Sequence, residues 1–176
     1  MIPEYRFSIY KAPISNTIPV KKITLEEIAR LISGDKYKSI TDEIQNSSNK
    51  EQQNKLKAKY LDYVTFSGVF SKRSRNGLIV HSNLICIDID NLKDLNQIKE
   101  KLTSILPPVL MFTSPSGKGL KIVYKIVITE NVTHDKYFKA LLNFLNKKLK
   151  IEIDQGCKDI PRACFLCHDP NVYFNT

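Results

Sequence analysis

The stretch Leu84-Ile-Cys-Ile-Asp-Ile-Asp90 decides how this chain folds. Its apolar run is typical of a central strand that is buried on both faces. Because successive side chains of a strand point to opposite faces, Asp88 and Asp90 share one face, roughly 6–7 Å apart. Two carboxylates in apolar surroundings repel each other, and a divalent cation such as Mg²⁺ or Mn²⁺ would relieve that repulsion. The alternative is that the strand simply ends at Asp90 and both side chains reach water.

The residues on either side of this strand predict further strands that alternate with helices. Strands are expected at residues 5–10, 63–70, 78–90, 109–113 and 120–128, and helices at 24–33, 91–106 and 133–150. Residues 36–62 are polar and predict two helices with a loop near residues 46–49, and residues 151–176 predict irregular chain with short strands. Thr24 and Glu27 have the spacing of a capping box at a helix start. The alternation predicts an α+β (α/β) fold with a central mixed sheet flanked by helices.

Length and charge restrict the class of protein. With 176 residues the chain forms one domain, 1–176, in which a helical N-terminal part, 1–62, precedes a core, 63–176. Lys and Arg number 27 against 18 Asp and Glu, a net charge of +9 that attracts polyanions. Nucleic acid is the first candidate partner and an anionic membrane the second. The alternative is a lysine-rich surface that only aids solubility.

The chain shows no secretory signal and no apolar run long enough to span a membrane, so we expect a cytoplasmic location. The four cysteines are then expected to be thiols rather than disulfides. Cys157, Cys164, Cys167 and His168 offer ligands for zinc, but their spacing is loose, and buried free thiols are the favoured interpretation.

A second motif, Thr113-Ser-Pro-Ser-Gly-Lys-Gly-Leu-Lys121, lies between two predicted strands. Its glycines let backbone N–H groups turn toward an anion, and its serines and lysines add side-chain donors. A plain hairpin turn is the alternative.

A third motif is Ile151-Glu-Ile-Asp154, followed by Arg162. Asp154 is a candidate third carboxylate, preferred over Asp159 because it follows apolar residues. Arg162 has the fork geometry that holds a phosphate. A surface cluster of ion pairs is the alternative.

The three motifs, in this order, resemble those of the archaeo-eukaryotic primase superfamily: an hhhDhD strand, a loop of small residues and an hD segment. The chain is most similar to the N-terminal primase-polymerase-like domain of virulence-associated E (VirE-type) proteins of mobile elements. This similarity rests on FSGVF, HSNLICIDIDN, TSPSGKGLKIVY and CKDIPRACFLCHDPNVYFN, and covers about residues 60–176. One departure is Lys121, at a position where many active members carry a histidine.

The resemblance implies an RRM-like catalytic half and a template-directed nucleotidyltransferase, a DNA primase or polymerase. Asp88, Asp90 and Asp154 would hold two Mg²⁺ or Mn²⁺ ions, one to activate the primer 3′-hydroxyl and one to bind the incoming triphosphate. The residues expected at the nucleotide are Ser114, Ser116, Gly117, Lys118, Lys121 and Arg162. Those expected at the template backbone are Lys72, Arg73 and Arg75.

The implied partners are single-stranded or primed DNA and nucleoside triphosphates, with a helicase or similar module in the same or a neighbouring chain. The resemblance also implies that this domain belongs to a longer protein. Two other functions suit the same residues. One is a non-catalytic nucleic-acid-binding module that keeps the fold, and the other is a two-metal nuclease.

Overall fold

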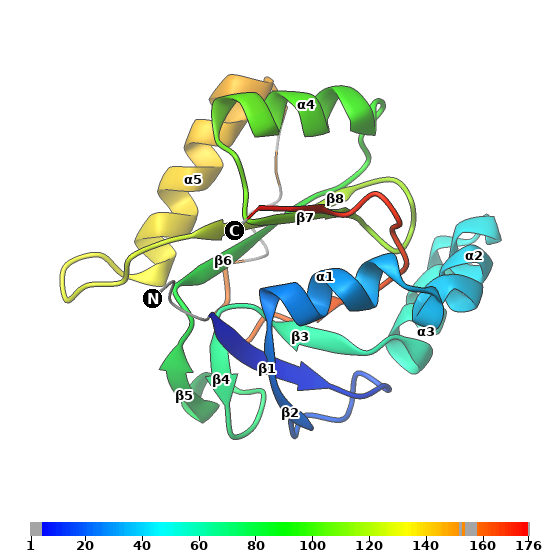
Figure 1. Ribbon diagram of the computed structural model, residues 1–176, viewed down its shortest axis with the longest axis horizontal. Helices are drawn as coiled ribbons and strands as arrows, with labels where there is room; N and C mark the ends of the chain where they lie inside the picture. Colours follow the sequence, from blue (N-terminus) through cyan, green and yellow to red (C-terminus); the bar gives the residue numbers. More distant parts are fainter. Residues whose placement is uncertain (1–4, 152, 154–157, 176) are drawn as a thin grey trace.

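The computed structural model describes residues 5–151, 153 and 158–175 (Figure 1). In chain order the elements are β1 Arg6–Tyr10, β2 Lys21–Thr24, α1 Leu25–Ser33, η1 Asp35–Tyr37, α2 Lys38–Asn46, α3 Lys50–Tyr60, β3 Tyr63–Thr65, β4 Gly68–Phe70, η2 Arg75–Gly77, β5 Leu78–His81, β6 Leu84–Ile89, α4 Leu95–Ile105, β7 Leu110–Thr113, β8 Leu120–Lys125, α5 His134–Leu149, β9 Cys164–Phe165 and β10 Tyr173–Phe174. The mixture of helices and antiparallel strands confirms the predicted α+β class. None of the helices in the described part of the chain is long and apolar enough to cross a membrane.

Two four-stranded sheets form the centre of the molecule, with strand orders β2-β1-β3-β9 and β10-β7-β8-β6. This corrects the expectation of one central mixed sheet, because neighbouring strands within each sheet are antiparallel. The physical reason lies in the second sheet. Helix α4 carries the chain from β6 to β7, which run in the same direction, but β8 returns between them and pairs with both. The result is a split βαβ unit.

The two faces of β6 and β8 have different surroundings. Ile85, Ile87 and Ile89 of β6 pack with Ile122 of β8 and with the helices α4 and α5, which cover this face of the sheet (Figure 1). On the opposite face, Leu84 and Val123 join a second core formed with α1 and the first sheet. Strand alternation then places Asp88 and Lys121 on the same face as Leu84 and Val123, toward the first sheet.

Local signals in the sequence set several element ends. The predicted capping box is confirmed: the Glu27 N–H donates to Thr24 Oγ1 and the Thr24 N–H donates to Glu27 Oε2, at 3.2 and 2.9 Å. The helix predicted to start at Asn91 begins later than expected. Asn91 has φ 55°, a left-handed conformation that asparagine tolerates, and Asp94 caps α4 three residues later.

The polar N-terminal helices are held to the sheets by a buried carboxylate. Asp62, at the junction of α3 and β3, accepts hydrogen bonds from the Ala12 N–H, the Tyr37 hydroxyl and Lys36 Nζ, at 3.1, 2.9 and 2.7 Å. These donors come from separate segments before α3. The two helices predicted in residues 36–62 are confirmed as α2 and α3, and this network fixes the end of α3.

Two histidines that have no partner nearby in the sequence meet in the fold. His81 Nε2, at the end of β5, lies 3.0 Å from His134 Nδ1, at the start of α5. His134 is buried, and burial, with a smaller contribution from His81, lowers its pKa to about 4. Both rings therefore have a structural role as neutral groups that join β5 to α5.

We expect this pair to make the fold sensitive to acid. Unfolding returns His134 to a pKa near 6.5, so the unfolded state binds the extra proton between pH 6.5 and 4 and stability falls across that window. The loss is expected to be at most ~3 kcal/mol. Urea denaturation measured at several pH values should show a shallower fall for His134→Leu than for the wild type. Equal slopes would contradict the assignment.

Candidate functional site

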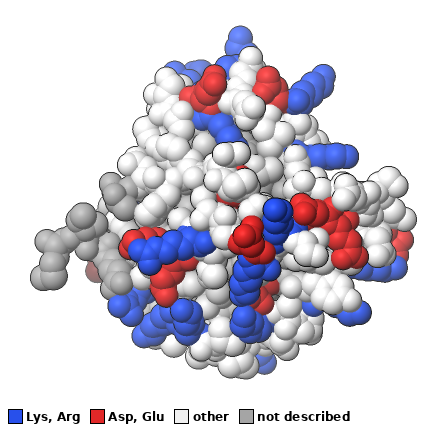
Figure 2. Space-filling model, turned by 45° about the vertical axis from the view of Figure 1, so that its right-hand side comes forward, with Lys and Arg blue, Asp and Glu red and all other residues white. Residues whose placement is uncertain are grey.

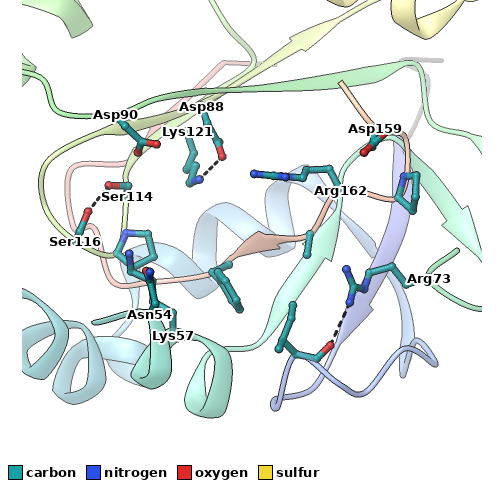
Figure 3. A pocket seen from close by; sticks show the side chains of 15 residues that line it. Asn54, Lys57, Arg73, Asp88, Asp90, Ser114, Ser116, Lys121, Asp159 and Arg162 are labelled. Carbon is teal, nitrogen blue, oxygen red and sulfur yellow. Dashed lines mark hydrogen bonds and ion pairs between the residues drawn. The ribbon is translucent and has the colours of Figure 1, made fainter. Parts of the chain in front are cut away.

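A pocket of about 530 Å³ opens at the carboxyl end of β6, between the two sheets (Figure 3). Its charged lining consists of Lys57, Arg73, Asp88, Asp90, Lys121, Asp159 and Arg162. These residues come from α3, the turn after β4, the β6 and β8 strands and the segment before β9. The pocket therefore brings together parts of the chain that are more than 100 residues apart.

Asp88 and Lys121 form a buried ion pair in the wall of this pocket. They are direct partners in the β6–β8 register, with Lys121 Nζ 2.5 Å from Asp88 Oδ2. Their side chains are only 13% and 14% exposed. Burial alone would lower the pKa of Lys121, but the Asp88 carboxylate outweighs it, so the pKa is raised well above its usual value. Lys121 is therefore a firmly protonated cation.

Asp90 lines the same pocket as Asp88, which confirms that the two carboxylates share a face. Asp90 is exposed, just past the end of β6. The start of β8 approaches it closely because residue 119 is glycine. A Cβ at Gly119 would lie 2.4 Å from the Ile89 carbonyl oxygen and 3.1 Å from Asp90 Oδ1, so any side chain there would push the loop away from the acids.

The serine-glycine loop contributes hydroxyl groups to the pocket. Ser114 and Ser116 both line it, and their Oγ atoms are 3.2 Å apart. The loop also closes on itself: the Ser114 N–H donates to the Gly119 carbonyl and the Gly117 N–H to the Ser114 carbonyl, both at 2.8 Å. The backbone N–H groups of Ser114 and Gly117 are therefore hydrogen-bonded within the loop and do not point toward a ligand. Gly117, at φ 72°, serves the turn, and Lys118 lines a neighbouring pocket.

The segment before β9 supplies Arg162 and Asp159. The Arg162 side chain points toward the Asp88–Lys121 pair (Figure 3). The backbone N–H of Arg162 donates to the backbone carbonyl of Asp159 at 3.0 Å. Asp154, the preferred third carboxylate, lies outside the described residues. Asp159 is the other candidate for that role, and it lines the pocket.

The three basic residues of the turn after β4, Lys72, Arg73 and Arg75, lie in different environments. Arg73 lines the pocket, donates to the Ile14 carbonyl at 3.2 Å and has its guanidinium carbon 5.1 Å from the centre of the Tyr63 ring. Arg75 pairs with Asp159 at 3.3 Å on the surface. Lys72 is exposed and outside the pocket lining. Of these three side chains, only that of Arg73 lines the pocket that holds Asp88 and Asp90.

Sequence reasoning missed the contribution of α3. Asn54 and Lys57 are three residues apart on this helix and both line the pocket. Lys57 is half-buried, and burial together with the charge of Lys121 lowers its pKa. The only signal in the sequence was a helix that is polar on more than one side.

The donor set suits a hard divalent cation in part. Asp88 and Asp90 offer carboxylate oxygens, which Mg²⁺ and Mn²⁺ prefer. The described residues contain no group of three or more His, Cys, Asp or Glu side chains arranged to hold a metal ion. A cation would therefore take its remaining ligands from water, from a phosphate or from residues outside the described part, and Asp88 would have to share or release Lys121.

The cysteine motif does not form a metal site among the described residues. The Cys167 thiol contacts the Thr113 carbonyl at 3.1 Å, whereas His168 Nδ1 lies 2.9 Å from the Gly34 carbonyl. Cys86, Cys164 and Cys167 are free thiols, as predicted. Cys157 lies outside the described residues.

Comparison with known proteins gives one result. The family model described as "BT4734-like, N-terminal domain" matches residues 55–174. No curated protein and no solved structure matches the chain. The matched range begins within α3 and includes most of the pocket lining.

We expect Asp88 and Lys121 to be energetically coupled. Asp88→Ala leaves a buried, unpaired ammonium and is expected to cost ~3 kcal/mol of unfolding free energy. Lys121→Met alone leaves a buried carboxylate, and the double variant removes both charges. Urea denaturation of all four proteins should give a coupling energy of about 1–3 kcal/mol. Additive losses would contradict a direct ion pair, and Asp90→Ala, at an exposed position, is the control expected to cost less than 1 kcal/mol.

Proposed function

The chain belongs to the family of BT4734-like N-terminal domains, and we propose, from the geometry of its pocket, that this domain is a metal-dependent, template-directed nucleotidyltransferase of the primase-polymerase type. The observation that carries the proposal is the composition of one pocket. Asp88 and Asp90 lie side by side at the end of β6 and face Lys57, Arg73, Lys121 and Arg162. Carboxylates that suit a divalent cation, set opposite several fixed cations, match the charges of a metal-bound triphosphate.

The acidic side chains of the pocket would bind a cation, and its basic and hydroxyl side chains would bind phosphate oxygens. A divalent cation held by Asp88 and Asp90 would neutralise phosphate oxygens and activate an attacking hydroxyl. Arg162 and Lys121 approach the same point from opposite sides and would bind the non-bridging oxygens. Ser114 and Ser116 add neutral hydroxyl donors beside Asp90. Arg73 would face a more distant part of the substrate.

Lys121 would have two alternative partners in this site, the Asp88 carboxylate and a phosphate. Without a phosphate, its ammonium occupies the Asp88 carboxylate at 2.5 Å. A triphosphate gives the lysine another anion and frees Asp88 for the cation. Lysine can thus serve the phosphates, whereas it does not provide the proton transfer of a neutral imidazole.

A non-catalytic nucleic-acid-binding module is the second candidate, and the same ion pair favours it. A buried carboxylate that is already neutralised by Lys121 needs no metal ion. In that case the pocket would bind nucleic acid through its cations, and its acids would serve the fold.

Calorimetry decides between the two. Titrating Mn²⁺ with a non-hydrolysable nucleoside triphosphate should show binding to the wild type that falls at least ~10-fold in Asp88→Asn and in Asp90→Asn, a loss of ~1.4 kcal/mol or more. Asn keeps the size of each side chain, and Asp42→Asn, on the exposed face of α2, is the matched control. The wild type should then extend a primed template in Mn²⁺, and the two variants should not.

Absence of metal-dependent nucleotide binding in a folded wild type would reject the catalytic proposal. DNA binding that survives both substitutions would then support the binding module.

A further inference from the structure

The pocket that holds Asp88 and Asp90, the acidic pair, continues into a second pocket of about 250 Å³. The two pockets together are called the groove. The second pocket shares Asn54, Lys57, Asp90 and Ser116 with the larger one, so the two form one continuous path. Its own walls come from the start of α3 and from the tip of the serine-glycine loop. The notable feature of these walls is a cluster of three lysines, Lys50, Lys57 and Lys118.

Within residues 5–151, 153 and 158–175, the three lysines have no acidic partner. Among the described residues, no carboxylate lies within 4 Å of any of their ammonium groups, although Asp90 contributes to the same pocket. Other lysines of the same helix behave differently. Lys55 Nζ pairs with Glu51 at 2.7 Å, and Lys59 lies over the Tyr60 ring. On α3, Lys50 and Lys57 therefore line the pocket with neither a carboxylate partner among the described residues nor an aromatic ring beneath them, unlike Lys55 and Lys59.

Lys57 lines both pockets. It is half-buried, and burial and the charge of Lys121 lower its pKa, against which Asp90 acts only in part. A half-buried ammonium beside a second ammonium is stabilised by an anion placed between them. The Asp62 network holds the end of α3 beside the sheets.

The backbone of α3 does not supply the anion donors. Asn49 caps this 11-residue helix and already accepts from the Glu51 and Gln52 N–H groups. The charged donors that the pocket offers are therefore the lysine ammonium groups, and neutral hydroxyl and amide side chains line the rest of it: Ser48, Gln53, Asn54, Asn91 and Ser116.

We propose that Lys50, Lys57 and Lys118 form a phosphate-binding subsite adjacent to the acidic pair, on the α3 side of the groove. Its ligand is a phosphate group of the polyanionic substrate, either the tail of a nucleoside triphosphate or the sugar-phosphate backbone of a DNA strand. The identity of that substrate rests on the proposed function, whereas the subsite itself rests on the three unpaired lysines. In this arrangement α3 binds part of the substrate of a site whose acids lie on β6.

The test compares two double variants of the same helix. Lys50→Gln/Lys57→Gln removes two subsite charges. Lys55→Gln/Lys59→Gln removes the same charge from side chains that line neither pocket. Binding of a fluorescein-labelled oligothymidylate is measured by anisotropy over a range of salt concentrations, and binding of a nucleoside triphosphate by calorimetry. Both are done without divalent metal, so that a failure of the metal site leaves this result intact.

We expect the subsite variant to bind at least one of the two ligands ~10-fold or more weakly, and the control variant to bind within ~3-fold of the wild type. If the strand is the ligand, the salt dependence of oligothymidylate binding should also become shallower by about 0.7 per lost contact. A loss with oligothymidylate alone identifies the strand as the source of the phosphate, and a loss with the triphosphate alone identifies the nucleotide. Equal behaviour of the two double variants with both ligands, in proteins with unchanged thermal unfolding, would overturn the proposal.

Discussion

The arrangement of the rest of the site depends on the largely buried ion pair between Asp88 and Lys121. The partners lie opposite each other on antiparallel strands, at 2.5 Å, with their side chains almost excluded from water. An isolated charge at either position would be strongly destabilising. Strand alternation allows the pair to exist, because it sends the neighbouring isoleucines to the helical face and leaves the charges on the face toward the first sheet.

Several local features follow from keeping that face open to the groove. Gly119 lets the loop before β8 pass against the end of β6 without a side chain that would displace Asp90. The left-handed Asn91 turns the chain away directly after Asp90, so α4 begins only at Leu95 and does not cover the acids. The loop then satisfies its own amides, which leaves the hydroxyl groups of Ser114 and Ser116 to face the pocket.

The sequence predicts those parts of the fold that depend on local patterns. The apolar run into Asp88 and Asp90, the Thr24–Glu27 capping box and α5 all require only neighbours in the chain. It predicts the strand that becomes β8 but not that this strand pairs between β6 and β7, since pairing order is set by contacts distant in sequence. The sequence also does not predict that α3 lines the groove, because the surface of this helix is polar. A helix that lines a charged pocket lacks the apolar stripe that marks a helix packed on a core, and the partners of His81 and Arg75 are likewise 53 and 84 residues away.

The distribution of charge also bears on what the groove can bind. Acidic and basic side chains lie side by side on the face shown in Figure 2, so the net charge of +9 does not act there as a uniform basic field. Under the proposed function, recognition would depend on individual cations of the groove, such as Lys50, Lys57 and Lys118, rather than on a uniform field. Most described acidic groups near the groove already have partners, as Asp88 has Lys121 and Asp159 has Arg75. Under the proposed function, an entering phosphate would compete with Asp88 for Lys121, whereas no carboxylate of the described residues lies within 4 Å of the ammonium groups of Lys50, Lys57 and Lys118. The lysines of α3 and the loop would then bind first, and the ion pair would open only for a ligand that reaches both.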